Sequence, residues 1–526
     1  MTATGTGTAT FGFWAVADEA PTRAAVVGPG DTTISYAELR GVGRAMARGL
    51  WALGLRRGDG LAALLPNRST FFAAHLAAME AGLYLVPVNT HLAEAEVTYV
   101  LGDCDARALV TDADLAPLSR AAVATSLIDP RACFADPHAD GFRPLGDLLD
   151  LGHAAPPLPP GLGAGTTMMY TSGTTGRPKG VRRPLPEADP NTVYGSAAAV
   201  YCQGFGMPTG RGVHLVCGPL YHAGPSASAV AALHAGNTIV LMDRWEPEAC
   251  LAMIERHRVT STQMVPTMFH RLLALPAPVR EKYDLSSLVS VMHTGAPCPM
   301  PVKTKLMQWL GPVVYETYGG TESVATIATP RRWLERPGTV GRAIHGITLH
   351  IVGDDGQECR PGEPGTIYVE NANAPSVEYF KDPEKTRGMR RGSWVTLGDI
   401  GHLDEDGFLF LRDRAVDMII SGGINIYPAE IESALLESEL VADVAVIGAP
   451  DDEWGEQVVA IIELAPGVPG DAATVAALLE HCAKQLARFK LPRRIDFVPD
   501  LPRLPSGKVQ KRVLRAPYWE GTDRSI

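Results

Sequence analysis

The stretch that decides the fold runs from Thr166 to Gly180 and reads TTMMYTSGTTGRPKG. It begins as an apolar, strand-like run and continues, from Thr171, as a loop with four hydroxyls, three glycines and two cations in ten residues. Glycines let backbone N–H groups approach phosphate oxygens, hydroxyl groups donate further hydrogen bonds, and Arg177 and Lys179 neutralise negative charge. The composition therefore predicts a loop that wraps a polyphosphate, with a plain surface turn as the alternative.

Two other motifs do not fit this loop. A Walker A loop requires a lysine directly after its second glycine, whereas Lys179 comes later and Pro178 interrupts the expected helix entry. A nucleophile elbow requires a glycine two residues before its serine, where this chain has Tyr170. We therefore do not expect Ser172 to act as a nucleophile.

The segments before the loop alternate between helical and strand-like patterns. Ser35 and Glu38 form a capping-box pattern, and apolar residues then recur at helical spacing over 39–50 before Gly54 ends the run. Further elements follow as a strand-like run at 61–65, a helix opened by Ser69 and a second strand-like run at 84–88. Alternation of this kind predicts parallel strands joined by crossover helices.

The segments after the loop indicate further folding units. The connection at 156–165, rich in proline and glycine, separates two doubly wound α/β subdomains. Between about 330 and 410, short β-like runs lie between glycine and proline turns, which predicts a small antiparallel or barrel-like subdomain. The pattern then becomes mixed again. We therefore predict an N-terminal domain over 1–413 and a small, mobile α+β C-terminal domain over 414–526.

Composition narrows the class of protein. The chain has 526 residues, of which 46% are hydrophobic and 20% charged, as expected for a folded globular protein with more than one domain. Its net charge of −11 argues against a nucleic-acid partner, because phosphate backbones require a basic surface. The eight cysteines form no CxxC pair, which disfavours a zinc site and a disulfide framework. The start of the chain lacks the features of a signal peptide, and we expect a cytoplasmic protein without a transmembrane segment.

Five motifs in a fixed order resemble those of the adenylate-forming superfamily, which holds acyl- and aryl-CoA synthetases, peptide-synthetase adenylation domains and luciferases. The first is the loop itself, from Tyr170 to Val181. The others are Tyr318-Gly319-Gly320-Thr321-Glu322, Gly398-Asp399 with Arg412-Asp413-Arg414, Ser421-Gly422-Gly423, and Pro505-Ser506-Gly507-Lys508. Together they extend over almost the whole chain, and they are most similar to those of the acyl-CoA synthetase and fatty-acid-CoA ligase branch.

The resemblance implies how the chain binds ATP and Mg²⁺. Glu322 would hold Mg²⁺ on the phosphates as a hard oxygen ligand, and Thr321 would contact the phosphates. Tyr318 would stack on adenine, with plain core packing as its alternative, and the segment that begins at Gly295 would line the opposite side of the base. Asp399 would accept hydrogen bonds from both ribose hydroxyls. The other positions that the resemblance assigns to nucleotide or CoA binding are Thr171, Ser172, Gly173, Thr174, Thr175, Gly176, Lys179, Gly295, Ala296, Pro297, Gly319, Arg414, Gly422 and Gly423.

The resemblance further implies a two-step mechanism with a rotating C-terminal domain. Lys508 corresponds to the family's catalytic lysine, which faces the carboxylate and the α-phosphate in the first step. The loop at Gly422 and Gly423 would then pass pantetheine in the second step. Val416 occupies the hinge position, where the family usually has Asp or Lys. A basic stretch either pairs with the CoA phosphates or is simply solvated, and its members are Arg488, Lys490, Arg493 and Arg494.

The acid substrate is indicated by the segment after 213. Amino-acid-activating relatives carry an aspartate early in this region, whereas 213–241 contains no acidic residue. The run from Pro219 to Ser226 resembles fatty-acyl and aryl-CoA ligases, in which the histidine at the position of His222 borders the acyl pocket. Small residues beyond it indicate a deep cavity, and they also suit close helix packing. We assign to the substrate pocket His222, Gly224, Ser228 and Thr317, and to the catalytic set Lys508, Glu322, Thr171 and His222.

These observations predict an acyl-CoA synthetase that uses ATP, Mg²⁺ and coenzyme A on a hydrophobic carboxylic acid. Because the chain ends 18 residues after Lys508, we expect a free acceptor rather than an attached carrier domain. Two alternatives stay open, namely an acyl-AMP ligase that loads a separate acyl-carrier protein and a nucleotide-binding protein without catalysis. Assembly as a homodimer is also left open.

Overall fold

The computed structural model describes residues 10–126, 128–171, 178–296, 298–372, 377–414, 417–421, 424–451, 454–504 and 507–520, without the side chains of Asp413, Arg414 and Asn425. The chain forms two compact units. The first comprises Met1–Met264, Leu275–Met292 and Ala374–Gly388, and the second comprises Val265–Ala274, His293–Asn373 and Met389–Ile526.

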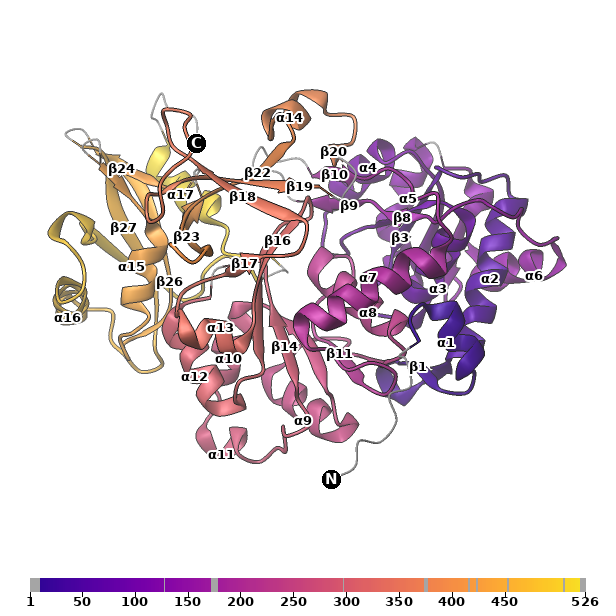
Figure 1. Ribbon diagram of the computed structural model, residues 1–526, viewed down its shortest axis with the longest axis horizontal. Coiled ribbons are helices and arrows are strands. Elements are labelled where there is room, and N and C mark those ends of the chain that lie inside the picture. Colours follow the sequence, from indigo (N-terminus) through magenta and orange to yellow (C-terminus); the bar gives the residue numbers. More distant parts are fainter. Residues whose placement is uncertain are drawn as a thin grey trace. The chain divides into compact units, whose positions relative to one another are not determined.

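The first unit contains a six-stranded, wholly parallel sheet in the order β7-β6-β5-β3-β4-β8 (Figure 1). Its strands are β3 (Gly60–Leu64), β4 (Tyr84–Pro87), β5 (Ala106–Asp112), β6 (Cys133–Asp136), β7 (Arg143–Pro144) and β8 (Thr166–Thr167). Every residue of β3 and β4 is buried. Continuous burial of this kind requires cover on both faces, as in a doubly wound α/β layer. The predicted parallel α/β arrangement is confirmed.

Two helices on this sheet test the predicted start signals. Helix α2 (Tyr36–Ala52) begins with a complete capping box, in which Ser35 Oγ accepts a hydrogen bond from Glu38 N and Glu38 Oε2 accepts one from Ser35 N. Helix α3 (Ser69–Ala81) begins at the predicted residue, but its N-cap is Arg68 and no side chain caps it. Ser69 is therefore the first helical residue and not the cap.

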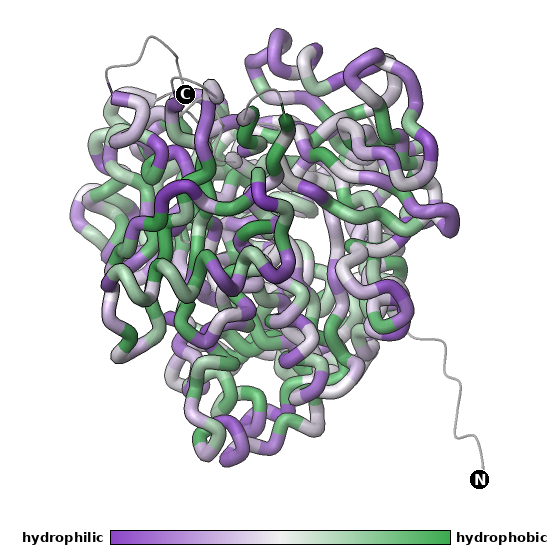
Figure 2. The backbone as a smooth tube through the Cα atoms, turned by 90° about the vertical axis from the view of Figure 1, so that its left-hand side faces the viewer, coloured by the Kyte–Doolittle hydropathy of each residue, from purple (hydrophilic) through white to green (hydrophobic). Residues whose placement is uncertain are grey.

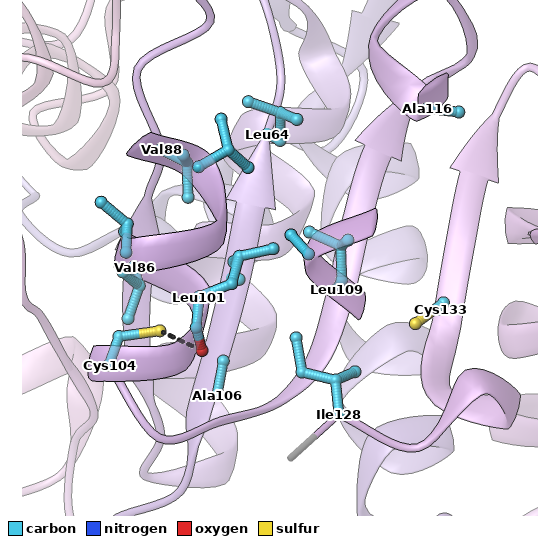
Figure 3. Packing of buried hydrophobic residues seen from close by; sticks show 14 of the residues in the cluster. Leu64, Val86, Val88, Leu101, Cys104, Ala106, Leu109, Ala116, Ile128 and Cys133 are labelled. Atoms are coloured by element: carbon cyan, nitrogen blue, oxygen red, sulfur yellow. Dashed lines mark hydrogen bonds between the residues drawn. The ribbon is translucent and has the colours of Figure 1, made fainter. Parts of the chain in front are cut away.

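The core between this sheet and its helices is aliphatic (Figure 3). Side chains from β3, β4, β5 and β6 meet those of α4 (Glu94–Asp103). Cys104, just after α4, is 3% exposed, and its thiol contacts the carbonyl of Leu101 at 3.7 Å. This cysteine therefore acts as a small apolar core residue, in agreement with the absence of a disulfide pattern.

A second run of paired strands in the first unit has the order β14-β13-β11-β12-β1-β2 and belongs to a 14-stranded sheet. Its strands are β1 (Ala24–Val27), β2 (Thr33–Ser35), β11 (Val213–Val216), β12 (Thr238–Leu241), β13 (Ser261–Met264) and β14 (Ser290–His293). Helices α7 (Pro190–Phe205) and α8 (Ala223–His234) lie side by side along it (Figure 1). The apolar run from 227 to 242 thus consists of most of α8 followed by β12.

A small antiparallel sheet completes the first unit. It joins β9 (Met169–Thr171), β10 (Lys179–Arg182) and β20 (Glu378–Tyr379) in the order β20-β10-β9. The strand β9 is the end of the apolar run that precedes the predicted polyphosphate loop. The loop is therefore the connection between two paired strands.

The second unit contains an antiparallel run of strands in the order β18-β19-β22-β23-β17-β16-β15. These strands are β15 (Val314–Gly319), β16 (Val324–Ala328), β17 (Gly341–Ala343), β18 (Ile347–Val352), β19 (Gly365–Asn371), β22 (Trp394–Leu403) and β23 (Phe408–Arg414), with β21 (Arg390–Arg391) paired to β22. The antiparallel character predicted for residues 330–410 is confirmed.

The strands that follow residue 417 form a separate five-stranded sheet. It contains β24 (Ile419–Ser421), β25 (Ile424–Ile426), β26 (Val441–Asp451), β27 (Gly455–Leu464) and β28 (Arg494–Val498). Alternate residues of β26 and β27 enter two different cores. One core includes α15 (Pro428–Leu435) and α16 (Ala472–Ala483), and the other includes α17 (Lys511–Trp519). A sheet covered on both faces by helices fits the predicted α+β end of the chain.

The remaining helices lie between these strands. They are α1 (Phe13–Glu19), α5 (Ala116–Thr125), α6 (Leu145–Ala154), α9 (Pro247–His257), α10 (Pro266–Leu273), α11 (Ala277–Arg280), α12 (Met300–Leu310), α13 (Pro330–Glu335) and α14 (Pro383–Gly388), with short 3-10 turns at Pro29–Asp31, Ala113–Leu115, Pro130–Ala132 and Arg488–Lys490. Figure 2 shows hydrophobic residues, in green, interspersed with hydrophilic ones, in purple, along the backbone. Within the described ranges, no helix is long and apolar enough to cross a membrane.

Helix α6 packs on α2 through a glycine, which provides a test of the first unit. A Cβ added at Gly152 would lie 1.7 Å from the carbonyl oxygen of Ala45, on the facing helix. We expect Gly152→Ala to destabilise the protein by about 1–3 kcal/mol, because the clash outweighs the roughly 1 kcal/mol gain in helix propensity. Gly146→Ala in the same helix is the control, since a Cβ there meets nothing within 4 Å. Urea unfolding of both variants should separate them, and equal midpoints would contradict the packing role.

Candidate active site

The ends of the predicted polyphosphate loop are fixed by strand pairing. Thr171 ends β9 and pairs with Lys179, the first residue of β10. Gly180 packs against the ring of Tyr170, where an added Cβ would lie 3.0 Å from Cζ. The hydroxyl of Tyr170 donates a hydrogen bond to Asp103 Oδ2 at 2.5 Å. Thr171 and Lys179 are therefore held together, while Ser172, Gly173, Thr174, Thr175, Gly176 and Arg177 lie outside the described residues.

A buried asparagine positions the segment that carries His222. Asn67 is 8% exposed and follows β3. Its amide nitrogen donates to the carbonyls of Gly218 and Met242, at 3.2 and 3.1 Å, and its oxygen accepts from Leu220 N at 3.0 Å. The side chain thus joins the end of β11 to the end of β12. His222 follows as the N-cap residue of α8.

The first half of α8 is built from small residues, as predicted. Gly224 is half-buried, and Ser226 and Ser228 are 5% and 0% exposed. Ser228 Oγ donates to the carbonyl of Pro225 at 3.0 Å. Burial raises the pKa of Tyr201 on the neighbouring helix α7, and a hydrogen bond with Ser228 opposes that shift. Ser228 therefore contributes to the contact between α7 and α8, and its role in an acyl pocket stays a prediction.

In the second unit, Tyr318 and Asp399 are in direct contact. The Tyr318 hydroxyl donates to Asp399 Oδ2 at 2.9 Å. The ring is 6% exposed and belongs to an apolar cluster with Ala325 and Val340. Asp399 follows Gly398, which has a φ of +81°, in the left-handed region that favours glycine. Asp399 also pairs in register with Arg414, whose side chain lies outside the described part.

The turn after Tyr318 carries Thr321 and Glu322 between β15 and β16. It is closed by a hydrogen bond from Gly320 N to the Ser323 carbonyl at 2.8 Å. A Cβ on Gly319 would lie 2.5 Å from that same carbonyl, so only glycine fits there without movement. The Glu322 carboxylate lies over Gly320, where an added Cβ would be 2.7 Å from Oε2. One carboxylate beside polyphosphate suits Mg²⁺, which is commonly bound by one or two carboxylates and substrate phosphates.

The predicted catalytic lysine follows a tight, well-bonded hairpin. Leu504 N donates to the carbonyl of Lys508, and Gly507 N donates to the carbonyl of Leu504, both at 2.8 Å. Gly507 has a φ of +83°, and a Cβ there would lie 3.1 Å from Val265 Cγ2. The other methyl group of Val265 faces Gly295, at 4.0 Å from the position of a Cβ. The lysine hairpin and the predicted adenine wall therefore meet at the start of α10.

A buried ion pair supports the strand that carries Tyr318. Lys303 Nζ on α12 lies 2.5 Å from Glu316 Oε2 on β15, and the Lys303 side chain is 0% exposed. His293 Nε2 lies 3.5 Å from the same oxygen. Burial by itself raises the pKa of a carboxyl group, but His293 and Lys303 lower the pKa of Glu316 to about 2. Burial and the neighbouring Lys303 ammonium lower the pKa of His293, whereas the Glu316 carboxylate raises it.

Thr317, which was assigned to the substrate pocket, is bonded within the sheet. Thr317 Oγ1 donates to the Thr326 carbonyl at 2.7 Å, within the sheet. Ala296 is described, whereas Pro297, Val416, Gly422 and Gly423 lie outside the described residues.

Three members of the basic stretch are in ion pairs: Lys490 with Glu430, Arg493 with Asp451 and Arg494 with Asp496. Among the described residues, no group of three or more His, Cys, Asp or Glu side chains is arranged to hold a metal.

Two residues that position the site, Asn67 and Lys303, were not predicted from the sequence. The position of Asn67 could have been predicted, because a polar residue that follows a buried parallel strand lies at the carboxyl edge of the sheet. The burial of Lys303 could not have been predicted, because a single lysine in an amphipathic segment has the same sequence pattern as a solvent-exposed lysine.

The sequence profile of the family described as "AMP-binding enzyme" matches residues 13–376, and that of the "AMP-binding enzyme C-terminal domain" matches 430–508. The chain belongs to the AMP-binding enzyme family.

Relatives of this AMP-binding enzyme include the long-chain-fatty-acid–CoA ligase FadD13 of Mycobacterium tuberculosis, which is 32% identical and aligns with 93% of this chain and 94% of its own. The fatty acid–[acyl-carrier-protein] ligase ScoC of Streptomyces coeruleorubidus is 31% identical, over 97% and 96% of the two chains. The structure of o-succinylbenzoate CoA synthetase (MenE) of Bacillus subtilis with the acyl-adenylate OSB-AMP matches with a TM-score of 0.79 and 29% identity, over 95% and 97% of the two chains.

The family assignment covers both the fold and the class of reaction. The two profiles and the full-length structural match place this AMP-binding enzyme in the adenylate-forming superfamily, as the five motifs indicated. It is an ATP-dependent, AMP-forming ligase, which excludes the alternative of a nucleotide-binding protein without catalysis.

The buried pair Lys303–Glu316 yields a stability prediction. We expect Lys303→Met to destabilise the AMP-binding enzyme by about 3–5 kcal/mol, because it leaves a buried carboxylate without its partner. The double variant Lys303→Met/Glu316→Gln should recover most of this loss, since no buried charge remains. Lys385→Met, which breaks a surface pair with Asp382, is the control and should change stability by less than about 1 kcal/mol. Urea unfolding decides the question, and a single variant as stable as the control would contradict it.

Proposed function

We propose that this enzyme is an acyl-CoA synthetase for a hydrophobic carboxylic acid. In the first step, a carboxylate oxygen attacks the α-phosphorus of ATP, forming acyl-AMP and releasing pyrophosphate. In the second step, the CoA thiol attacks the acyl carbon, forming the thioester and releasing AMP, while the thiol proton passes to solvent. ATP makes the chemistry favourable because AMP is a far better leaving group than the oxygen of a free carboxylate.

The observation that carries the proposal is the meeting of Gly507 and Gly295 on the two methyl groups of Val265. Lys508 directly follows Gly507, and Gly295 begins the segment assigned to adenine. A long cation beside the nucleotide segment is what the first step needs, since negative charge develops on the α-phosphate. Tyr318 supports the same reading by fixing Asp399, the residue assigned to the ribose.

The other roles follow from donor chemistry. Glu322 would hold Mg²⁺, which when bound neutralises the ATP phosphates, and Thr171 and Lys179 would flank the phosphate chain. Asp399 can accept both ribose hydroxyls because a carboxylate has two oxygens. For the second step, we assign the pantetheine passage to Gly422 and Gly423, with Val416 as hinge between domains 1–413 and 414–526.

The preference for a hydrophobic acid rests on the segment around α8. It contains no carboxylate that could pair with a substrate amine, and the next acidic residue, Asp243, is paired with Arg68 at 2.5 Å. We assign the acyl path to the small residues that follow His222. FadD13 and MenE bear names of fatty and succinylbenzoyl substrates, so both straight-chain and aromatic acids belong in the test.

The deciding experiment is a pyrophosphate-release screen over straight-chain, branched, aromatic and polycyclic acids. Release that requires both acid and ATP supports adenylation. The acceptor is then settled by mass spectrometry, with CoA or a phosphopantetheinylated carrier protein added to the active acid. Consumption of the carrier but not CoA would replace our proposal by the acyl-carrier ligase, the activity in ScoC's name.

Lys508→Ala separates the two half-reactions. We expect it to slow adenylation by about 100- to 1000-fold, the usual effect of removing a preorganised donor at developing charge. Thioester formation from synthetic acyl-AMP and CoA should stay within about twofold of the wild type, because the lysine faces the site only in the first step. Acid-dependent ATP–pyrophosphate exchange and thioester formation are measured in parallel. Equal damage to both steps would contradict the role of Lys508.

Gly224→Trp tests the acyl path. A large ring at this half-buried position should exclude long or bulky acids and spare short ones, at about 0.8 kcal/mol for each CH₂ that loses burial. We would compare kcat/KM over acids of increasing length, since specificity is expressed in that ratio. Val200→Trp on α7 is the control, because Val200 is 68% exposed. If the variant and the wild type decline in parallel along the series, Gly224 does not line the acyl path.

A further inference from the structure

The carbonyl oxygen of Gly507, directly before Lys508, accepts hydrogen bonds from two side chains. Thr267 Oγ1, in the first turn of α10, donates to it at 3.1 Å, and Arg503 Nη1 donates to it at 2.6 Å. The two donors come from segments more than 200 residues apart in the sequence. A peptide group held from both sides has a fixed orientation, and this peptide sets the base of the Lys508 side chain.

Arg503 is itself anchored. Its second terminal nitrogen, Nη2, pairs with Asp443 Oδ2 on β26, and both side chains are about one-fifth exposed. The other oxygen of Asp443 accepts a hydrogen bond from Val444 N at 2.8 Å. Because one nitrogen contacts the carbonyl and the other the carboxylate, only a planar fork satisfies both partners at once. A lysine at 503 would keep the charge but lose one of the two contacts.

Gly507 allows this arrangement for steric reasons. Its φ of +83° favours glycine, and a Cβ there would lie 2.8 Å from Thr267 Oγ1. Backbone pairing holds the hairpin on both sides, since Arg503 bridges Val509 and Gln510 N donates to the Pro502 carbonyl. The hairpin also packs on one core of the C-terminal sheet through Leu501 and Val509. The lysine is thus presented by a rigid hairpin rather than by a free chain end.

We propose that Thr267 and Arg503 are positioning residues that orient the Gly507–Lys508 peptide for acyl-adenylate formation. The inference rests on the proposed function, in which Lys508 acts in the first step. Thr267 lies in the predicted N-terminal domain and Gly507 in the predicted C-terminal domain. A rotation between the steps breaks their hydrogen bond, so the Thr267 hydroxyl serves adenylation alone. Arg503, Asp443 and Gly507 belong to one domain and move together.

The test compares Thr267→Val with Thr267→Ser. Valine keeps the shape of threonine without the hydroxyl, whereas serine keeps the hydroxyl without the methyl group. We expect Thr267→Val to lower kcat of acid-dependent ATP–pyrophosphate exchange about five- to tenfold, the effect of one lost hydrogen bond, with KM for ATP within about twofold. Thr267→Ser should retain wild-type exchange within about twofold. Thioester formation from synthetic acyl-AMP should be unchanged in both.

Arg503→Lys gives a second, independent measurement if Thr267→Val does not fold. It should lower exchange at least as much as Thr267→Val, because it retains the charge but not the fork. Arg131→Lys, at an exposed arginine paired with Asp129, is the matched control and should be silent.

The outcomes separate this inference from the proposed function. A wild type without acid-dependent exchange would refute the proposed function. An active wild type with unimpaired Thr267→Val or Arg503→Lys would refute the positioning role. Equal losses in both half-reactions, or a Thr267→Ser as slow as Thr267→Val, would also refute it, because they indicate packing rather than a hydrogen bond.

Discussion

An ammonium and a carboxylate buried together, Lys303 and Glu316, constrain the part of the structure on which the nucleotide site depends. An unpaired charge in such surroundings is so costly that the two groups must stay together in the folded protein. Glu316 and Tyr318 point to the same face of β15, since side chains alternate along a strand. Fixing Glu316 therefore fixes Tyr318, and the Tyr318 hydroxyl in turn fixes Asp399. Residues from α12, β15 and β22 are thus linked in one chain of contacts.

The lysine hairpin is held in a different way. The bond from Thr267 to Gly507 is one neutral, part-buried hydrogen bond, which water can replace at modest cost. Arg503 and Asp443, in contrast, form a charged pair that stays with the hairpin. The ion pair thus lies within the C-terminal segment, whereas the bond from Thr267 to Gly507 is a single neutral hydrogen bond between that segment and α10. This distribution suits the proposed rotation, because a strong contact across the predicted boundary would slow the release of the C-terminal segment.

Local patterns predicted much of the fold. The capping box at Ser35, the buried runs of β3 and β4 and the antiparallel texture after 330 are all confirmed, because near neighbours in sequence determine them. The helix expected to open at Ser69 begins at that residue, with Arg68 as an N-cap that makes no side-chain hydrogen bond. Gly398 and Gly507, which belong to the predicted motifs, both have the left-handed backbone that favours glycine. Lys303, Thr267 and Arg503 were not predicted, because no local pattern links them to their partners and only the folded chain brings each pair together. Lys303 lies 13 residues from Glu316, Arg503 lies 60 residues from Asp443, and Thr267 lies 240 residues from Gly507.

The predicted domain boundary at 414 and the boundaries of the two compact units lie at different places in the chain. Residues 265–274 group with everything after 389, so the compact unit joins α10 to the C-terminal sheet across the predicted boundary. Sheet pairing divides it otherwise, because in the described part of the chain the strands after 417 pair only with one another. The second compact unit includes the hydrogen bond between Thr267 and Gly507. The strand pairing, in contrast, concerns the C-terminal sheet by itself, and a domain that moves as a rigid body keeps that pairing. A domain that docked for one step would belong to the same compact unit as α10 and would still have a sheet of its own. The boundary at 414 stays a prediction, and the sheet pairing is the property that a rotating domain would have to preserve.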